Sequence, residues 1–519
     1  MAHRPTVRAA NGMVASGHHL ATQAGIAALR DGGSAADAAI AAAAVCAVVM
    51  PNATSIGGDC FVLYYDARTR EVTAYNGSGA APGAIPSLSA FPETGAVLAT
   101  VPGAVHAWAD LLEDHGRLGL DRALRDATMY ALEGFPVGDR LAAEIVDARA
   151  RIAADPEAAR TYIPHGRVPR VGEILQQPDL AATLDEIAKT GADAFYRGEL
   201  AERIAQGVRG SDGSITAEDL AAHRTDRPDP LEVAYRGLRF LGQPPVSQGH
   251  ILMEELAIAG GLDLAKHAPL DPELVHAMVE IKKLAFADRD GHAGDPRRTG
   301  FDARRLLDPA FVAERRRQIG SRAADRAQHG ALGVPAHTTY LAAADRDGNC
   351  VSLIESVFHV FGAAVVVPGT GILLNNRLTG FSLDPASPNV LAPGKRPVHT
   401  LNAVIVLDGS QPRLVYGTPG AQAQVQTSFQ LAVALVDHAM AVQDAIEQPR
   451  WYHETGRTLR VEARFPEGTR KALAARGHEI ALLREWDDVT GGAQAIAIDP
   501  SGGFAGGADP RRDGHAAGY

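Results

Sequence analysis

The N-terminal fifty residues carry a long run of small apolar side chains with few polar interruptions, a pattern typical of buried helices. Residues 18–50 divide at Gly32-Gly33 into two expected helices, because the glycine pair interrupts the apolar periodicity. Ser34 is expected to cap the second helix, with Asp37 at its third position. The second helix is rich in alanine and shorter than a membrane span, so we expect it to lie inside the protein.

A change from helical to alternating periodicity follows at a glycine-rich turn, Ile56-Gly57-Gly58-Asp59. It predicts two strands with the sequences CFVLYYD and EVTAYN. Residues 104–264 are then predicted to be mainly helical, and a further helix is predicted over residues 272–288. Residues 301–333 are rich in Arg, Ala and Asp without sustained periodicity, which predicts an exposed and mobile segment.

The C-terminal part of the chain changes in character again and predicts mainly strands. Its apolar runs are TTYLAAAD from Thr338, CVSLIESVF from Cys350, AVIVLD from Ala403 and PRLVYG from Pro412. A helix is predicted over residues 423–438. Strands near both ends of the chain, with helices between them, predict one α/β (α+β) architecture assembled from distant halves.

Composition narrows the class of protein. The 519 residues include 50 basic and 61 acidic side chains, and the net charge of −11 disfavours binding to nucleic acid or to an anionic membrane. The three cysteines have no CxxC or Cys/His ligand spacing, so neither a zinc site nor a disulfide framework is expected. The N-terminus lacks the apolar core of a secretory signal peptide, so we expect a cytoplasmic protein, and no motif indicates a cofactor.

Thr338 and Thr339 stand at the head of a predicted strand, directly after the segment that is expected to be mobile. The β-propensity of threonine is sufficient to explain such a pair. A second interpretation is chemical, because an N-terminal threonine can use its own α-amine, with a pKa near ~8, as a base. Thr338 gains that amine only if the chain is cut after His337, and the Thr338 hydroxyl can make the cut by attacking the carbonyl of His337.

Further motifs occur in order along nearly the whole chain. They are GMVASGHHLATQAGIAALRDGGSAADAAIAAAAVCAVVMPNATSIGGDCF, VPGAVHAW, QPPVSQGHILMEEL, KLAFADRDGHAGDP, HTTYLAAADRDGNCVSL, LLNN, PGKRP, GTPGA and ADPRRDGHAAGY. Together they resemble the gamma-glutamyltranspeptidase family of N-terminal-nucleophile hydrolases. The resemblance implies a four-layer αββα sandwich, formed jointly by a large subunit, 1–337, and a small subunit, 338–519, after self-cleavage. It also implies a heterodimer of the two fragments and leaves open a dimer of such heterodimers.

The resemblance implies catalytic roles for five residues of the small subunit. Thr338 falls on the nucleophile position, Thr339 on the hydroxyl beside it, and Ser356 on a hydroxyl that orients the nucleophile. Gly420 and Ala421 fall where two glycines supply backbone N–H groups to an oxyanion hole. Alanine keeps its N–H group, so the substitution at 421 is compatible with this role.

The binding pocket departs from the family pattern. Nothing basic lies between Asn76 and Pro92, where the family has an arginine that binds the substrate's α-carboxylate. Phe358 stands at an asparagine position, Gly380 at an aspartate and His399-Thr400 at a serine pair. Because a bidentate clamp for a carboxylate is lost, we expect γ-glutamyl compounds to be poor substrates.

The replacements resemble a subgroup of the family that includes oxamate amidohydrolase, which cleaves a very small acyl amide. Arg377, His359 and His399 are the polar groups expected to bind a compact anion, with Phe358 and Thr400 beside them. A guanidinium suits a carboxylate because it donates two parallel hydrogen bonds. Arg377 is equally explained by an ion pair, and the two histidines by structural hydrogen bonds.

The predicted function is a self-processing amidohydrolase that acts on a small amide or an oxalyl- or oxamate-like acyl substrate through an acyl-enzyme on Thr338. Three alternatives stay open. The first is a γ-glutamyl hydrolase or transpeptidase, or a glutaryl-type acylase. The second is a hydrolase of a carbon–carbon bond to an oxalyl group in a biosynthetic pathway. The third is an uncut scaffold protein, because Tyr340 stands where the family usually has histidine.

Overall fold

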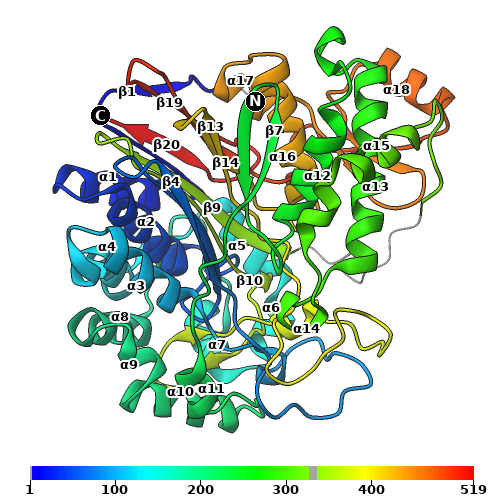
Figure 1. The fold of residues 1–519 in the computed structure, drawn as a ribbon. Helices are drawn as coiled ribbons and strands as arrows, with labels where there is room; N and C mark the ends of the chain where they lie inside the picture. The colour runs from blue at the N-terminus through cyan, green and yellow to red at the C-terminus, as the bar shows by residue number, and fades with distance from the viewer. Residues whose placement is uncertain (1–2, 327–335) are drawn as a thin grey trace.

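Two β-sheets packed face to face form the centre of the protein, and helices cover the outer face of each sheet (Figure 1). The computed structural model describes residues 3–326 and 336–519. The predicted four-layer αββα sandwich is confirmed.

The first sheet has six strands in the order β20-β2-β9-β10-β3-β4, and all neighbouring pairs are antiparallel. The strands are β2 (Gly12–Ser16), β3 (Asp59–Asp66), β4 (Glu71–Gly77), β9 (Ala336–Asp345), β10 (Cys350–His359) and β20 (His515–Gly518). Strands from before and after Thr338 are therefore hydrogen-bonded side by side in one sheet. The strands predicted in these regions are confirmed.

The second sheet has seven antiparallel strands in the order β1-β19-β18-β14-β13-β8-β7. They are β1 (Val7–Ala9), β7 (Leu231–Tyr235), β8 (Leu238–Gly242), β13 (Val404–Asp408), β14 (Gln411–Gly417), β18 (Gln494–Ile498) and β19 (Phe504–Ala508). Strands β7 and β8 lie in the region predicted to be mainly helical, so that prediction is wrong there. A two-residue turn joins them, in which Arg236 and Gly237 both have positive φ, and the five-residue strands are too short for a clear alternating pattern.

The helices α1 (His19–Arg30) and α2 (Ala35–Val49) confirm the prediction for residues 18–50 and cover the six-stranded sheet. Every residue of α2 is buried, because the helix packs against the sheet on one side and against α1 and α4 (Gly119–Glu133) on others. Alanine permits these close approaches, which explains the alanine-rich sequence.

The N-terminus of α2 is held by the predicted cap, and Asp37 makes more hydrogen bonds than a cap requires. Its carboxylate accepts from the backbone N–H and the hydroxyl of Ser34, at 2.8 and 2.9 Å. It also accepts from the backbone N–H groups of Arg117 and Leu118, at 2.8 and 3.0 Å. One buried carboxylate therefore joins the start of α2 to the connection between α3 (Ala104–His115) and α4.

The seven-stranded sheet is covered by α12 (Gly249–Ala259), α13 (Pro272–His292) and α16 (Ala423–Ala432), which continues into a π-helical turn, Val433–Asp437. A further helix, α15 (Pro309–Arg317), lies beside α12. Residues 301–333 were predicted to be exposed and mobile; α15 shows that part of this segment is a helix, most of whose residues are exposed or half-buried. An arginine-rich helix with one buried position, Val312, has little apolar periodicity to detect. Residues 327–333 of that segment lie outside the described residues.

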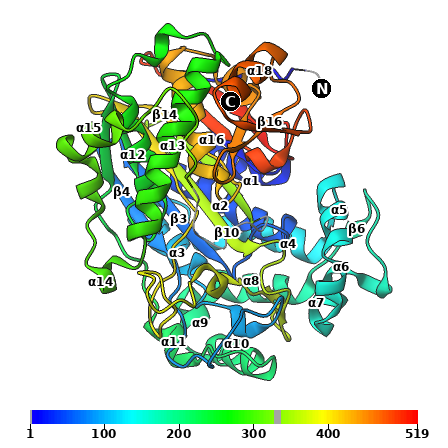
Figure 2. The same cartoon turned by 90° about the vertical axis from the view of Figure 1, so that its right-hand side faces the viewer.

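The remaining elements are short or peripheral, and α5, α6, α7 and β6 stand together at one side of the molecule (Figure 2). The full set of these remaining helices and strands is β5 (Phe135–Pro136), α5 (Asp139–Asp147), α6 (Arg149–Ala153), α7 (Pro156–Tyr162), β6 (Ile174–Leu175), α8 (Pro178–Thr190), α9 (Asp193–Tyr196), α10 (Glu199–Gly210), α11 (Ala217–Ala222), α14 (Pro296–Thr299), β11 (Val366–Val367), β12 (Ile372–Leu373), α17 (Val442–Glu447), β15 (Trp451–His453), β16 (Thr458–Glu462), α18 (Glu467–Ala475) and β17 (Glu479–Leu483). None of the helices in the described residues combines the length and the apolar character that crossing a membrane requires.

Side chains along β9 alternate between two hydrophobic cores. Tyr340 and Ala342 pack in the core between the two sheets, whereas Leu341 and Ala343 pack in the core beneath α1 and α2. This period of two decides on which face each threonine at the start of the strand lies.

We expect Asp37→Ala to destabilise the protein by about 2–4 kcal/mol, because it leaves the buried N–H of Ser34 and the part-buried N–H groups of Arg117 and Leu118 without an acceptor. Urea denaturation measures the change. Asp31→Ala, which removes the exposed carboxylate at the end of α1 and its surface ion pair with Arg122, is the control and should change stability by less than about 1 kcal/mol. Equal effects of the two substitutions would contradict the clamping role of Asp37.

Candidate active site at the start of β9

Thr338 is buried between the two sheets, and its neighbour Thr339 lies on the opposite face of β9. The hydroxyl of Thr339 faces α2, where it lies 3.9 Å from Cys46 Sγ. The two threonines therefore face different surroundings, as the alternation along β9 requires. Thr339 does not join the set of groups that surrounds the Thr338 hydroxyl.

Three polar groups meet around the hydroxyl of Ser356 on the neighbouring strand β10. Thr338 Oγ1 donates to Ser356 Oγ at 3.2 Å, and Ser356 Oγ donates to the carbonyl oxygen of His337 at 2.8 Å. Thr338 and Ser356 are both almost fully buried. The hydroxyl next to the His337–Thr338 peptide bond and the carbonyl of that bond are thus connected through a single serine.

Strand β10 is irregular directly after Ser356. Its pairing with β9 shifts between Glu355 and Phe358, and Phe358 has a φ of 81°, which is unusual for a bulky side chain. The Ser356 hydroxyl stabilises this bend by accepting the backbone N–H of Phe358 at 2.8 Å. The bend places the Phe358 ring against Arg377, whose guanidinium carbon lies 4.3 Å from the ring centroid.

Phe358 also contacts Ala421, one of the two predicted oxyanion-hole residues. Gly420 and Ala421 have positive φ angles of 128° and 51° and lead into α16. Within residues 3–326 and 336–519, neither backbone N–H group donates to another residue. Two adjacent, unpaired N–H groups next to the Phe358 ring are available to an oxygen atom of a ligand.

Arg377 is fully buried and bonded on one side only. Its Nε donates to Asp59 Oδ2 at 2.9 Å, and both side chains have no solvent exposure. Neither Nη1 nor Nη2 has a hydrogen-bond partner among the described residues. Burial lowers the pKa of Arg377, although the Asp59 carboxylate acts in the opposite direction. An ion pair was the alternative interpretation of Arg377 from the sequence, and the structure shows such a pair, with the buried carboxylate of Asp59.

The two predicted histidines differ in their surroundings. The His359 ring stacks on Phe358 at 4.3 Å, and Asn376 Nδ2 lies 2.9 Å from its Nδ1. Burial lowers the pKa of His359 to about 4, and the charges of Arg377 and Arg151 add to the effect. His399 is fully buried, and neither of its ring nitrogens has a partner within the described chain.

Burial lowers the pKa of His399 well below its usual value, and the nearby Arg377 and Arg396 guanidinium groups lower it further. The hydroxyl of the adjacent Thr400 is buried and also without a partner among the described residues. His359 is thus held by its protein neighbours, whereas His399 and Thr400 keep unused polar atoms.

The comparisons with known proteins agree with this geometry. Residues 21–519 match the sequence profile described as Gamma-glutamyltranspeptidase. The chain belongs to the gamma-glutamyltranspeptidase family. It is an N-terminal-nucleophile hydrolase by fold and family.

Individual relatives cover almost the whole chain. It is 38% identical to a glutathione hydrolase-like YwrD proenzyme of Bacillus subtilis, with 98% of each chain covered. It is 37% identical to an oxamate amidohydrolase proenzyme of Klebsiella pneumoniae, again with 98% of each chain covered. The crystal structure of a cephalosporin acylase from Bacillus halodurans superposes with a TM-score of 0.94 at 37% identity, covering 100% of this chain and 98% of that one.

Four residues of the site were not singled out from the sequence: Asp59, Asn375, Asn376 and Arg140. Asp59 and the two asparagines belong to the motifs IGGD and LLNN, which were recognised as motifs without a role for each member. Arg140 Nη2 lies 3.4 Å from His337 Nδ1, as does Glu144 Oε1 on the next turn of α5. No sequence signal connects α5 with His337, because the contact depends on the tertiary fold.

Tyr340 stands at the family's usual histidine position and is accommodated without strain on β9. Its hydroxyl lies 2.7 Å from Ser352 Oγ, and its ring packs on Gly417, where a Cβ atom would come within 2.4 Å of the ring. The tyrosine is therefore part of the core between the sheets.

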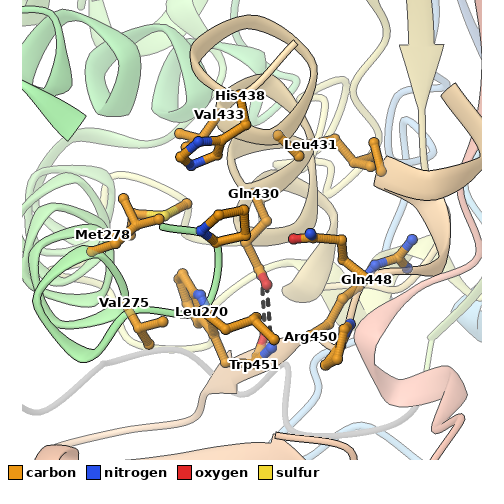
Figure 3. Close-up of a pocket in the computed structure, with 15 residues that line it drawn as sticks. Leu270, Val275, Met278, Gln430, Leu431, Val433, His438, Gln448, Arg450 and Trp451 are labelled. Atoms are coloured by element: carbon orange, nitrogen blue, oxygen red, sulfur yellow. Dashed lines mark hydrogen bonds between the residues drawn. The ribbon is translucent and has the colours of Figure 1, made fainter. Parts of the chain in front are cut away.

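Two other features lie outside this site. His276, Glu280 and His478 place three possible metal-ligand atoms within 4.8 Å of one another. However, Glu280 already accepts from Lys283 Nζ at 2.7 Å, and the two histidine rings contact each other at 2.9 Å. A small pocket of about 40 Å³ lies between α13 and the residues around Trp451 (Figure 3). Its lining includes none of the predicted site residues.

We expect acid to destabilise the protein between pH 6.5 and about 4, partly through His359. In the unfolded chain this histidine has a pKa near 6.5, whereas its pKa in the fold is about 4. The unfolded chain therefore takes up the proton first, so the stability is complete above pH 6.5 and is lost as the pH falls toward 4.

His359→Asn should reduce that acid-induced loss by up to about 3 kcal/mol. Urea denaturation at a series of pH values measures it, with the exposed His165→Asn as control. An unchanged pH dependence in His359→Asn would contradict a neutral, half-buried His359.

Proposed function

We propose that the protein is a self-processing amidohydrolase whose nucleophile is Thr338, freed by cleavage of the His337–Thr338 peptide bond. The observation that carries the proposal is the chain of hydrogen bonds from Thr338 Oγ1 through Ser356 Oγ to the carbonyl oxygen of His337. Ser356 accepts a hydrogen bond from the attacking hydroxyl and donates one to the carbonyl oxygen, so a proton taken from Thr338 is matched by the proton that Ser356 gives to that oxygen. Proenzyme names among the relatives support the same maturation.

The maturation reaction balances without a cofactor. The Thr338 hydroxyl adds to the His337 carbonyl carbon, the C–N bond breaks, and the acyl group passes from nitrogen to oxygen. Water then hydrolyses the ester, which releases the His337 carboxylate and leaves Thr338 with a free α-amine. That amine is the base that a threonine nucleophile needs at neutral pH.

The same threonine then hydrolyses the substrate. Its hydroxyl attacks the amide carbonyl while the α-amine takes the proton and passes it to the departing amine. The unpaired N–H groups of Gly420 and Ala421 are suited to stabilise the charge on the carbonyl oxygen. Water cleaves the acyl-enzyme and restores Thr338.

We infer that the acyl group is small and carries a carboxylate, as in oxamate. In this proposal Phe358 closes the acyl pocket at a short length; Arg377, which lies against its ring, has two nitrogens without partners among the described residues. Asp59 pairs with Nε alone, and the two remaining buried nitrogens are costly unless a ligand supplies acceptors for them. The 37% identity to an oxamate amidohydrolase proenzyme supports this substrate class.

The alternatives use the same nucleophile but need other pockets. A γ-glutamyl hydrolase, transpeptidase or glutaryl-type acylase needs room for a longer acyl chain, and the names of two relatives favour such activities. An oxalyl carbon–carbon hydrolase differs only in its leaving group. An uncut scaffold is disfavoured by the hydrogen bonds that connect Thr338 through Ser356 to the His337 carbonyl.

The purified protein should consist of two fragments of about 35 and 19 kDa, in proportion to residues 1–337 and 338–519 of the 54.5 kDa chain. The smaller fragment should begin TTYLAA. Mass spectrometry and N-terminal sequencing measure this. Thr338→Ala should stay intact and inactive, because one hydroxyl serves both reactions, whereas Thr339→Ala is the neighbouring control and should still be cut. A cut and active Thr338→Ala protein would exclude the assignment.

The mature protein should release ammonia from oxamate with a higher kcat/KM than it shows for γ-glutamyl or glutaryl anilides. Phe358→Gly should narrow this difference by about tenfold or more, because it opens the acyl pocket at a position whose φ of 81° glycine adopts readily. Phe361→Gly is the matched control, since Phe361 is also buried with a positive φ of 57° but packs on Tyr162. Higher activity of the unaltered enzyme on the longer acyl groups would favour the alternative.

A further inference from the structure

Two motifs that are far apart in the sequence, IGGD and LLNN, meet at Arg377. Asp59 of the IGGD turn accepts Arg377 Nε at 2.9 Å through Oδ2 and the backbone N–H of Gly79 at 3.0 Å through Oδ1. Asn375 of the LLNN motif accepts the backbone N–H of Arg377 at 3.0 Å. Each contact fixes a different part of the arginine.

Asn375 is itself held from both sides. Its Oδ1 accepts the backbone N–H and the hydroxyl of Thr100, both at 3.1 Å, and its Nδ2 donates to the carbonyl of Gly57 at 2.9 Å. Gly57 packs so closely that a Cβ atom there would lie 2.2 Å from the carbonyl oxygen of Leu373. The backbone that carries Arg377 is therefore rigidly supported.

The direction of the guanidinium follows from these contacts. Because Arg377 Nε donates to Asp59, the guanidinium nitrogens that remain free among the described residues are Nη1 and Nη2. The Phe358 ring covers one face of the guanidinium at 4.3 Å. A planar carboxylate can meet the free pair with two parallel hydrogen bonds.

We propose that Asp59 is a positioning residue that holds Arg377 as a fixed two-donor fork for a substrate carboxylate adjacent to the scissile carbonyl. The location of the scissile carbonyl rests on the function proposed above; the carboxylate fork itself does not. Asp59 acts through Arg377 and contacts neither the substrate nor Thr338.

Removing the Asp59 carboxylate changes the affinity for an anion, and the direction of that change distinguishes a positioning role from simple neutralisation of the Arg377 charge. If Asp59 only neutralised Arg377, its removal would leave a more positive site, and an anion would bind more tightly. If Asp59 orients the fork, its removal lets the guanidinium turn away, and the anion binds more weakly in spite of the added positive charge.

The experiment is titration calorimetry of the mature protein with oxalate, a planar dicarboxylate that needs no turnover. Asp59→Asn, which has the same shape and keeps an acceptor for Gly79, should weaken oxalate binding about tenfold or more. Arg377→Lys should weaken binding to a similar extent, because an ammonium group keeps the charge but lacks the fork. If Asp59→Asn fails to fold, Arg377→Lys tests the fork in its place.

Asp509→Asn is the matched control, because Asp509 also pairs with a buried arginine, Arg450, at 2.7 Å, outside the site. Its oxalate affinity should stay within about twofold of the unaltered protein. Tighter binding in Asp59→Asn, or no oxalate binding in the unaltered protein, would overturn the proposal. Failure of the chain to mature would instead refute the function proposed above, and oxalate binding to the uncut chain would still test the fork.

Discussion

The hydroxyl of Ser356 connects the parts of the site, because it is bonded to the nucleophile candidate, to the peptide bond before it and to the bend in β10. It accepts from Thr338 Oγ1 and from the backbone N–H of Phe358, and it donates to the carbonyl of His337. A hydroxyl has one proton and two lone pairs, so these three bonds use its full capacity. The position of Thr338 and the direction of the Phe358 ring are consequently set by the same atom.

Around that atom the protein buries polar groups whose hydrogen-bonding capacity it does not use. Arg377 Nη1 and Nη2, both ring nitrogens of His399 and the hydroxyl of Thr400 have no partner within the described residues. Elsewhere in the described chain some buried groups are paired, as Arg511 is with Glu462 at 2.6 Å, whereas others, such as the Glu255 carboxylate and the Asn402 amide, also lack a partner. Unpaired buried donors cost stability, and a ligand that supplies acceptors would satisfy the two free guanidinium nitrogens of Arg377 beside the Phe358 ring. Asp59 limits this cost at Arg377 and leaves only the two ends of the fork free.

Sequence periodicity was sufficient where an element is long and repeats its pattern, as in α1, α2, β9 and β10. It failed for β7 and β8, whose five residues each are too few for the alternation to be distinguished from a helical surface. The position of Thr338 was correctly expected at the head of a strand, but the two faces of β9 separate it from Thr339. Asp59 and Arg377 are 318 positions apart, so their contact could not be inferred from local pattern. Their shared role emerges only when β3 and the segment after β12 are brought together by the fold.

The arrangement of strands also explains how the fold is compatible with the proposed cleavage. Within the six-stranded sheet, β9 lies between β2 from the N-terminal part and β10 from the C-terminal part. The seven-stranded sheet likewise joins β13 to β8 and β19 to β1 across the two parts. Loss of the peptide bond before Thr338 leaves these pairs of strands hydrogen-bonded to each other. Separating the two fragments would expose the hydrophobic core between the sheets to water. The proposed cut would therefore create a new N-terminus inside an intact sandwich, at the head of β9, where the Thr338 hydroxyl is bonded to Ser356.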